Sequence, residues 1–120
     1  MPVRLLLVDD EAALAELLKK YLERLGYEVD LCLTPDAALA LFRENPRGYA
    51  LVLTDLTLPG MSGVEMLDRM RAIDPQVTAI LSSGYPHTFQ AARVTFLQKP
   101  FLPKALAALV EDLLKTKPPA

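Results

Sequence analysis

The sequence predicts an α/β domain, a single doubly wound parallel sheet of five strands in the order 2-1-3-4-5 with helices on both faces. Five short apolar runs, each ending at turn residues, alternate with segments of helical periodicity. Such runs are typical of strands buried on both faces, and their alternation with helices predicts parallel pairing. The 120 residues, 52% of them hydrophobic, suffice for one domain with one core. Right-handed crossovers restrict the strand order further.

The first half of the chain predicts two strands and two helices. Residues 3–8 form an apolar strand, and apolar residues then recur at helical spacing from residue 11 to 25, where Gly26 ends the helix. These helix positions are Leu14, Leu17, Leu18, Tyr21, Leu22 and Leu25. Residues 27–33 alternate apolar and polar, which indicates a strand with one wetter face at a sheet edge. Thr34-Pro35 then begins a helix over residues 35–44, with Leu39, Leu41 and Phe42 available for the core.

The second half of the chain predicts three strands and two clear helices. The central run from Tyr49 stops at Asp55 and turns at Pro59-Gly60, and Ser62 with Glu65 forms a capping box for a helix to about Ile73. Residues 77–82 and 94–98 are the last two strands, and a closing helix covers residues 102–115.

Only eleven residues, 85–95, join the last two strands. A crossover with a helix needs at least about 10–12 residues. We therefore expect a shortened fourth helix near residues 88–92.

Composition excludes several classes of protein. With 13 basic and 15 acidic residues the net charge is −2, which gives no general attraction to nucleic acid or an anionic membrane. No apolar run reaches the length of a membrane span, and we expect no signal peptide and a cytoplasmic location. The single cysteine, Cys32, excludes an internal disulfide and fits a packed, inert thiol. We assign residues 1–116 to the domain and residues 117–120 to a short tail.

Polar side chains follow four of the five predicted strands. Asp9 and Asp10 follow the first strand, Asp55 ends the third, Ser83 follows the fourth and Lys99 follows the fifth. The carboxyl ends of parallel strands share one edge of the sheet, and the order 2-1-3-4-5 changes direction between strands 1 and 3. We therefore expect these residues to meet in one crevice.

Each acid also has a simpler role open to it. Asp55 could end a strand or turn the chain, and Asp9 and Asp10 could cap the helix that begins near Glu11. Two or three acids beside Asp55 would repel one another without a cation. Because Mg²⁺ keeps several waters and takes one or two carboxylates, a magnesium site is the preferred interpretation.

Lys99 and the serines complete a set that suits phosphoryl transfer. Lys99 could be an ordinary surface lysine, and Ser83 an ordinary turn residue beside Gly84. At the crevice, Lys99 would hold a phosphoryl oxygen as a point charge, and a serine hydroxyl would donate to it. Ser82 competes with Ser83 for that role, since strand alternation does not decide between them. Asp55 would then attack phosphorus and form an aspartyl phosphate.

Four motifs give the sequence a family resemblance. They are Val8-Asp9-Asp10-Glu11, the run from Thr54-Asp55 through Pro59-Gly60 to Gly63, Leu81-Ser82-Ser83-Gly84-Tyr85, and Phe96-Leu97-Gln98-Lys99-Pro100-Phe101. Over residues 3–115 the sequence resembles the receiver domain of two-component response regulators, with a flavodoxin-like, CheY-like fold. The resemblance implies a phosphorelay protein that takes a phosphoryl group from a histidine kinase or histidine phosphotransfer domain.

The resemblance also implies a role for each matching residue. Asp55 would be the phosphoacceptor and a Mg²⁺ ligand. Asp10 would bind Mg²⁺ directly, Asp9 largely through water, and Thr57 through its backbone carbonyl.

The remaining implied roles belong to the switch. Ser83 would be the switch hydroxyl, Lys99 the invariant lysine of the family, and Phe96 a rotating switch aromatic, although an ordinary core position accounts for Phe96 equally well. The resemblance leaves a homodimer open and implies no nucleic-acid or membrane partner. Such a domain would catalyse only its own phosphorylation and dephosphorylation.

The sequence departs from the family in two ways. The segment after Ser83 is short and holds Tyr85-Pro86-His87, which puts a dimerisation or partner surface in doubt. No output domain follows Lys115, and the motifs around Ser83 and Lys99 look like receivers attached to histidine kinases. The chain is thus either a module of a hybrid kinase or a stand-alone regulator.

Three other functions are weighed against a phosphorylated switch. A phosphatase of the haloacid-dehalogenase type resembles Asp-x-Asp at its nucleophile, and position 57 here is Thr. A non-phosphorylated binding module of the same fold would not need the acid and lysine set. A nucleotide or flavin site would need a glycine loop where Asp9-Asp10-Glu11 stands.

Overall fold

The computed structural model describes residues 3–84 and 93–116, and in them a five-stranded parallel sheet carries two layers of helices. The strands are β1 (Arg4–Val8), β2 (Glu28–Cys32), β3 (Leu51–Asp55), β4 (Ala79–Ser83) and β5 (Val94–Gln98). The described helices are α1 (Ala12–Arg24), α2 (Pro35–Glu44), α3 (Gly63–Ile73) and α4 (Pro103–Thr116). The strand order is β2-β1-β3-β4-β5, which confirms the predicted topology and the edge position of β2.

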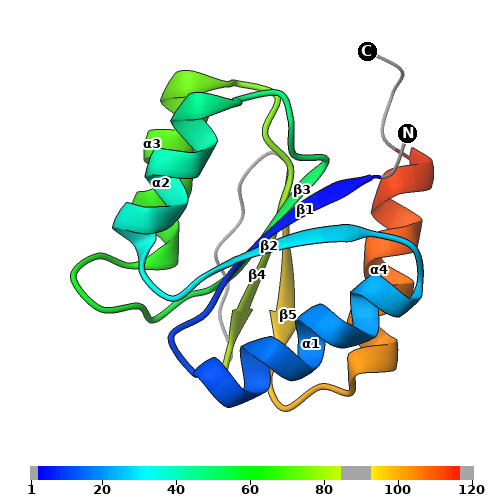
Figure 1. The fold of residues 1–120 in the computed structure, drawn as a ribbon. Helices are drawn as coiled ribbons and strands as arrows, with labels where there is room; N and C mark the ends of the chain where they lie inside the picture. Colours follow the sequence, from blue (N-terminus) through cyan, green and yellow to red (C-terminus); the bar gives the residue numbers. More distant parts are fainter. Residues whose placement is uncertain (1–2, 85–92, 117–120) are drawn as a thin grey trace.

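Two hydrophobic clusters form the core, one on each face of the sheet. Figure 1 shows α2 and α3 on one side of the sheet and α1 and α4 on the other. On one face α2 and α3 bury Leu39, Phe42 and Met66. On the other, α1 and α4 bury Leu22 and Val110. Because successive residues of β1 point to opposite faces, Leu5, Leu6, Leu7 and Val8 all lie in the core. This sandwich fixes the carboxyl ends of β1, β3 and β4.

The helix ends follow the local signals in the sequence. Thr34 Oγ1 accepts a hydrogen bond from the Ala37 N–H at 3.2 Å, and Ser62 Oγ accepts one from the Glu65 N–H at 3.1 Å. Gly26, at a φ of 101°, ends the turn after α1 in the left-handed region that favours glycine.

Some predicted details differ from the structure. β4 runs from Ala79 to Ser83, not over residues 77–82, and Ser83 is thus its last residue. Leu17 and Leu25 are more than half exposed. At 3.6 residues per turn Leu17 lies off the face that Ala15, Leu18 and Leu22 bury, and Leu25 lies beyond the last residue of α1.

The predicted helix near residues 88–92, the shortening of a fourth helix and the tail at 117–120 lie outside the described residues. Cys32 is buried, and burial raises the pKa of its thiol, as expected of a packed cysteine. Within the described parts of the chain, every helix is too short or too polar to cross a bilayer.

Candidate functional site

The carboxyl ends of β1, β3 and β5 bring three predicted site residues together. Asp9 follows β1, Asp55 is the last residue of β3, and Lys99 follows β5. The Lys99 N–H donates to the Ser83 carbonyl at 2.7 Å, which ties the end of β5 to the end of β4. The Lys99–Pro100 peptide bond is cis.

Asp55 sits on a strand end that is held from both sides. The N–H of Leu56 donates to the Ser82 carbonyl at 2.7 Å, and the N–H of Gly63 donates to the Leu56 carbonyl at 2.7 Å. A Cβ atom at Gly63 would overlap the main-chain carbonyl oxygen of Asp55. Glycine at position 63 therefore allows α3 to begin directly against the residue that carries the carboxylate.

Lys99 is shared among three carboxylates. Its Nζ donates to Asp55 Oδ2 at 2.9 Å and lies 3.7 Å from Glu11 Oε1 and 4.0 Å from Asp9 Oδ2. Burial alone would lower the pKa of Lys99, but the hydrogen bond and charge of Asp55, with the charges of Asp9 and Glu11, raise it. The lysine is thus a fixed positive charge at the site.

Asp9 is the most buried acid of the group, with 4% of its surface exposed. Its Oδ1 accepts a hydrogen bond from the Glu11 N–H at 2.9 Å. Burial raises the pKa of Asp9, and the charges of Asp55 and Glu11 add to this, while the Glu11 N–H and Lys99 act in the opposite direction. An additional cation would therefore favour the ionised form of Asp9.

Asp9, Glu11 and Asp55 form a group that could hold a metal ion. One carboxylate oxygen from each lies within 4.8 Å of the others. An all-oxygen, anionic set of this kind fits a hard divalent cation such as Mg²⁺. The donor chemistry therefore agrees with the metal that the sequence predicts.

Asp10 is not part of this group. Its side chain is exposed, and Glu11 takes the third place beside Lys99. Glu11 was not among the predicted site residues, although it is the third acid of the run that follows β1. The sequence signal for Glu11 was the run of three acids, Asp9-Asp10-Glu11. The run does not indicate which of these side chains point toward Asp55 and Lys99.

The two serines at the end of β4 differ in their surroundings. Ser82 pairs in register with Asp55, and its hydroxyl donates to the Thr54 carbonyl at 3.4 Å. Ser83 is 2% exposed, and its carbonyl accepts the Lys99 N–H. Of the other predicted residues, Thr57 is exposed in the loop after β3, and Phe96 is partly buried on β5 opposite Leu81.

The site can act chemically as an anionic nucleophile beside a cation. The Asp55 carboxylate is held at the edge of the sheet with 9% of its surface exposed, so it remains within reach of a reactant at that edge. Lys99 and a bound divalent cation would neutralise an incoming anion that approached it.

The sequence matches the family described as "Response regulator receiver domain" over residues 5–111. Among curated proteins it is 32% identical to the regulatory protein VanRB of Enterococcus faecalis, over 96% of this chain and 54% of that protein. It is 33% identical to the transcriptional regulatory protein ResD of Bacillus subtilis, over 93% of this chain and 48% of that protein. The chain thus spans about half the length of these relatives, and 32% of the response regulator ARR14 of Arabidopsis thaliana.

Solved structures show the same fold. The receiver domain of the hybrid histidine kinase CckA superimposes with a TM-score of 0.84 at 32% identity, over 92% of this chain and 98% of that one. A CheY-like receiver domain protein from Methanospirillum hungatei JF-1 superimposes with a TM-score of 0.87 at 30% identity, over 98% of this chain and 97% of that one.

Proposed function

Because the chain belongs to the receiver domain family of two-component response regulators, we propose that Asp55 is its phosphoacceptor. The observation that carries this proposal is the position of Asp55, at the carboxyl end of β3 with Lys99 Nζ 2.9 Å from its Oδ2. Carboxylate and ammonium come from strands that are not adjacent in the sheet, and no local capping or turn requirement accounts for their pairing.

The reaction is an in-line displacement at phosphorus. An oxygen of Asp55 attacks the phosphoryl group of a phosphohistidine on a histidine kinase or a histidine phosphotransfer domain. A P–O bond forms, the P–N bond breaks, and the histidine nitrogen leaves with the bonding pair and takes a proton from solvent. The Lys99 ammonium group, which donates to the Asp55 carboxylate before the reaction, then donates to a phosphoryl oxygen and stabilises its negative charge.

Mg²⁺ is the proposed cofactor, and when bound it supplies charge neutralisation to the acid cluster and to the phosphoryl oxygens. Asp9, Asp10, Asp55 and the backbone carbonyl of Thr57 are its proposed ligands. The group of Asp9, Glu11 and Asp55 oxygens supports a metal at this position, and it adds Glu11 to the side chains within reach.

Ser83 and Phe96 are the proposed switch residues. The main-chain hydrogen bond from Lys99 to Ser83 couples the site to the end of β4, and Phe96 lies in register with Leu81 on the neighbouring strand. The Ser83 hydroxyl donates to the phosphoryl group, and the resulting shift at β4 alters the packing of Phe96. Ser82, whose hydroxyl donates to the Thr54 carbonyl at 3.4 Å, is the alternative candidate for the donor.

The protein's chemistry is confined to its own phosphorylation and dephosphorylation. A phosphatase of the haloacid-dehalogenase type would need a second acid where Thr57 stands. We also propose that residues 1–116 form the receiver, that 117–120 are a tail, and that the protein acts in the cytoplasm. A histidine kinase is the expected phosphodonor, a homodimer remains open as an assembly, and this domain binds neither nucleic acid nor membrane.

Incubation with acetyl phosphate and Mg²⁺ tests the proposal. Intact-mass spectrometry should detect one added phosphoryl group in the parent protein and none in Asp55→Asn. Asp36→Asn, which removes an exposed carboxylate from the first turn of α2, should behave like the parent. An unmodified parent would reject the proposal in favour of a non-phosphorylated binding module.

A further inference from the structure

One edge of the sheet is open for pairing along β2. The Glu28 N–H donates to the Val3 carbonyl, and the Cys32 carbonyl accepts the Asp9 N–H. In a parallel strand the main-chain groups of alternate residues face the same neighbour, so Glu28, Asp30 and Cys32 pair with β1. The N–H and C=O groups of Val29 and Leu31 therefore face outward, and no other described strand pairs with them.

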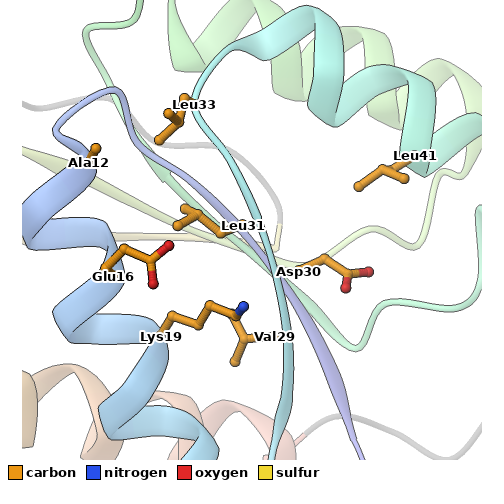
Figure 2. Close-up of a pocket in the computed structure, with 8 residues that line it drawn as sticks. All are labelled: Ala12, Glu16, Lys19, Val29, Asp30, Leu31, Leu33 and Leu41. Atoms are coloured by element: carbon orange, nitrogen blue, oxygen red, sulfur yellow. The ribbon is translucent and has the colours of Figure 1, made fainter.

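A hollow of about 480 Å³ runs along this edge between the two helical layers. Glu16 and Lys19 of α1 line it on one side, Leu41 of α2 lines it on the other, and β2 forms its floor (Figure 2). The open main-chain groups thus lie in a groove that is flanked by a helix on each face of the sheet. A groove of this form fits an extended strand.

The side chains of β2 alternate in chemistry from one face to the other. Figure 2 shows Leu31 directed toward α1 and Asp30 directed toward α2. Val29 and Leu31 contribute to the core under α1, and Leu33, which follows β2, is 43% exposed. Glu28 and Asp30 lie on the opposite face, so an incoming strand would meet aliphatic groups on one face and acids on the other.

The charges around the groove favour a basic partner. Asp30 accepts a hydrogen bond from the Tyr49 hydroxyl at 2.6 Å, and a neutral phenol leaves its negative charge in place. Glu16 has no ion-pair partner among the described side chains, whereas Lys19 lies 4.0 Å from Glu23. Arg4 is paired with Glu28, and its charge also acts on Asp30. Of these two acids only Asp30 has no ion pair among the described side chains, so Asp30 carries the selectivity.

We propose that the β2 edge binds an extended segment of a partner protein in which basic residues alternate with aliphatic ones. The segment adds to the sheet as a sixth strand, with its main chain bonded to Val29 and Leu31, its aliphatic side chains against Leu31 and Leu33, and its basic side chains beside Asp30. A second copy of this chain is a poorer occupant, because antiparallel pairing of two β2 strands about Asp30 places like charges opposite each other.

A binding experiment with two blocked synthetic peptides tests this proposal directly. In one peptide lysine alternates with valine, and in the other glutamate alternates with valine. Fluorescence anisotropy should show that the lysine peptide binds at least tenfold more tightly, since each pair of like charges opposes pairing. Amide hydrogen exchange at Val29 and Leu31 should slow when that peptide is bound.

Variants of the full chain test whether the peptide binds at the β2 edge. Leu31→Pro removes an outward N–H without removing a hydrogen bond to β1, and it should abolish binding. Asp30→Asn, which keeps an acceptor for the Tyr49 hydroxyl, should weaken binding of the lysine peptide about fivefold, whereas Asp36→Asn, the same charge change elsewhere on the surface, should not. A thermal melt and phosphorylation by acetyl phosphate establish that each variant is folded.

Three results would overturn the proposal. They are equal binding of both peptides, unchanged binding by a folded Leu31→Pro, and a dimeric mass in sedimentation without peptide that Leu31→Pro makes monomeric. The last result would assign the edge to a second copy of this chain.

Discussion

The ionised groups of this protein fall into two kinds of region. At the carboxyl edge of the sheet, one lysine is shared among Asp9, Glu11 and Asp55. Elsewhere in the described chain the recorded ion pairs join one cation to one acid, as in Arg4–Glu28 and Lys115–Glu111, and they are largely exposed. The first region holds an excess of buried negative charge, and the second does not. Unbalanced charge is costly to bury, so the first region is the one that an additional cation would stabilise.

Removal of the shared cation should have the largest effect. We expect Lys99→Met to slow phosphorylation by acetyl phosphate by about 10²–10³-fold, because the variant has no positive charge at position 99 to stabilise the phosphoryl oxygens in the transition state. Lys115→Met removes a lysine of a one-to-one exposed pair and should leave the rate unchanged. Rates of mass increase measure both variants, and similar rates would show that sharing Lys99 has no chemical importance.

Gly63→Ala should distort the main chain that supports the acceptor. The added methyl group overlaps the Asp55 carbonyl, so we expect the free energy of unfolding to fall by about 2 kcal/mol in urea. In Gly84→Ala the added Cβ meets no atom of residues 3–84 or 93–116 within 4 Å, and a change within about 0.5 kcal/mol is expected. Equal stabilities would mean that the loop after β3 can move aside.

Tyr49→Phe removes a hydrogen bond to Asp30 that lies outside the site. Burial, together with the hydrogen bond to Asp30 and its negative charge, raises the pKa of Tyr49, so the phenol stays protonated. Loss of its hydrogen bond to a carboxylate should cost about 1–2 kcal/mol of stability in urea and leave phosphorylation unchanged. A change in the phosphorylation rate would contradict the separation of the two regions.

Asp9→Asn, unlike the substitutions above, should raise the free energy of unfolding. Burial raises the pKa of Asp9 above its ordinary value of 3.8, so the ionised side chain opposes folding at neutral pH. Asparagine keeps an acceptor for the Glu11 N–H, and we expect a gain of about 1 kcal/mol without Mg²⁺.

The pH dependence of that gain provides its control. A raised folded-state pKa means that the folded protein holds the proton more tightly, so the parent recovers stability as pH falls through that pKa toward 3.8. The advantage of Asp9→Asn should therefore shrink in acid, and saturating Mg²⁺ should stabilise the parent more than the variant. A variant less stable than the parent at pH 7 without metal would disprove the charge argument.

Local signals made much of the fold predictable. Each of two helix starts depends on a few neighbouring residues, which are Thr34 with Pro35 for α2 and Ser62 with Glu65 for α3. The structure confirms both predicted starts. The strand order alone was enough to predict that Asp9, Asp55 and Lys99 lie close together, because the carboxyl ends of parallel strands share one edge of the sheet.

The parts that were missed depend on orientation rather than on order. Nothing in the run Asp9-Asp10-Glu11 says that Glu11, and not Asp10, lies beside Lys99, because the backbone angles between β1 and α1 decide it. The exposure of Leu17 depends on which arc of α1 faces the sheet. The close approach of Gly63 to Asp55 joins two elements that the sequence analysis treated separately.

That approach has a consequence for sequence change in this protein. We expect substitutions at position 63 to affect Asp55, since the main chain of Asp55 keeps its place only while the first residue of α3 lacks a side chain. In a saturation mutagenesis experiment, tolerance at position 63 should track retention of signalling and not helix-forming tendency.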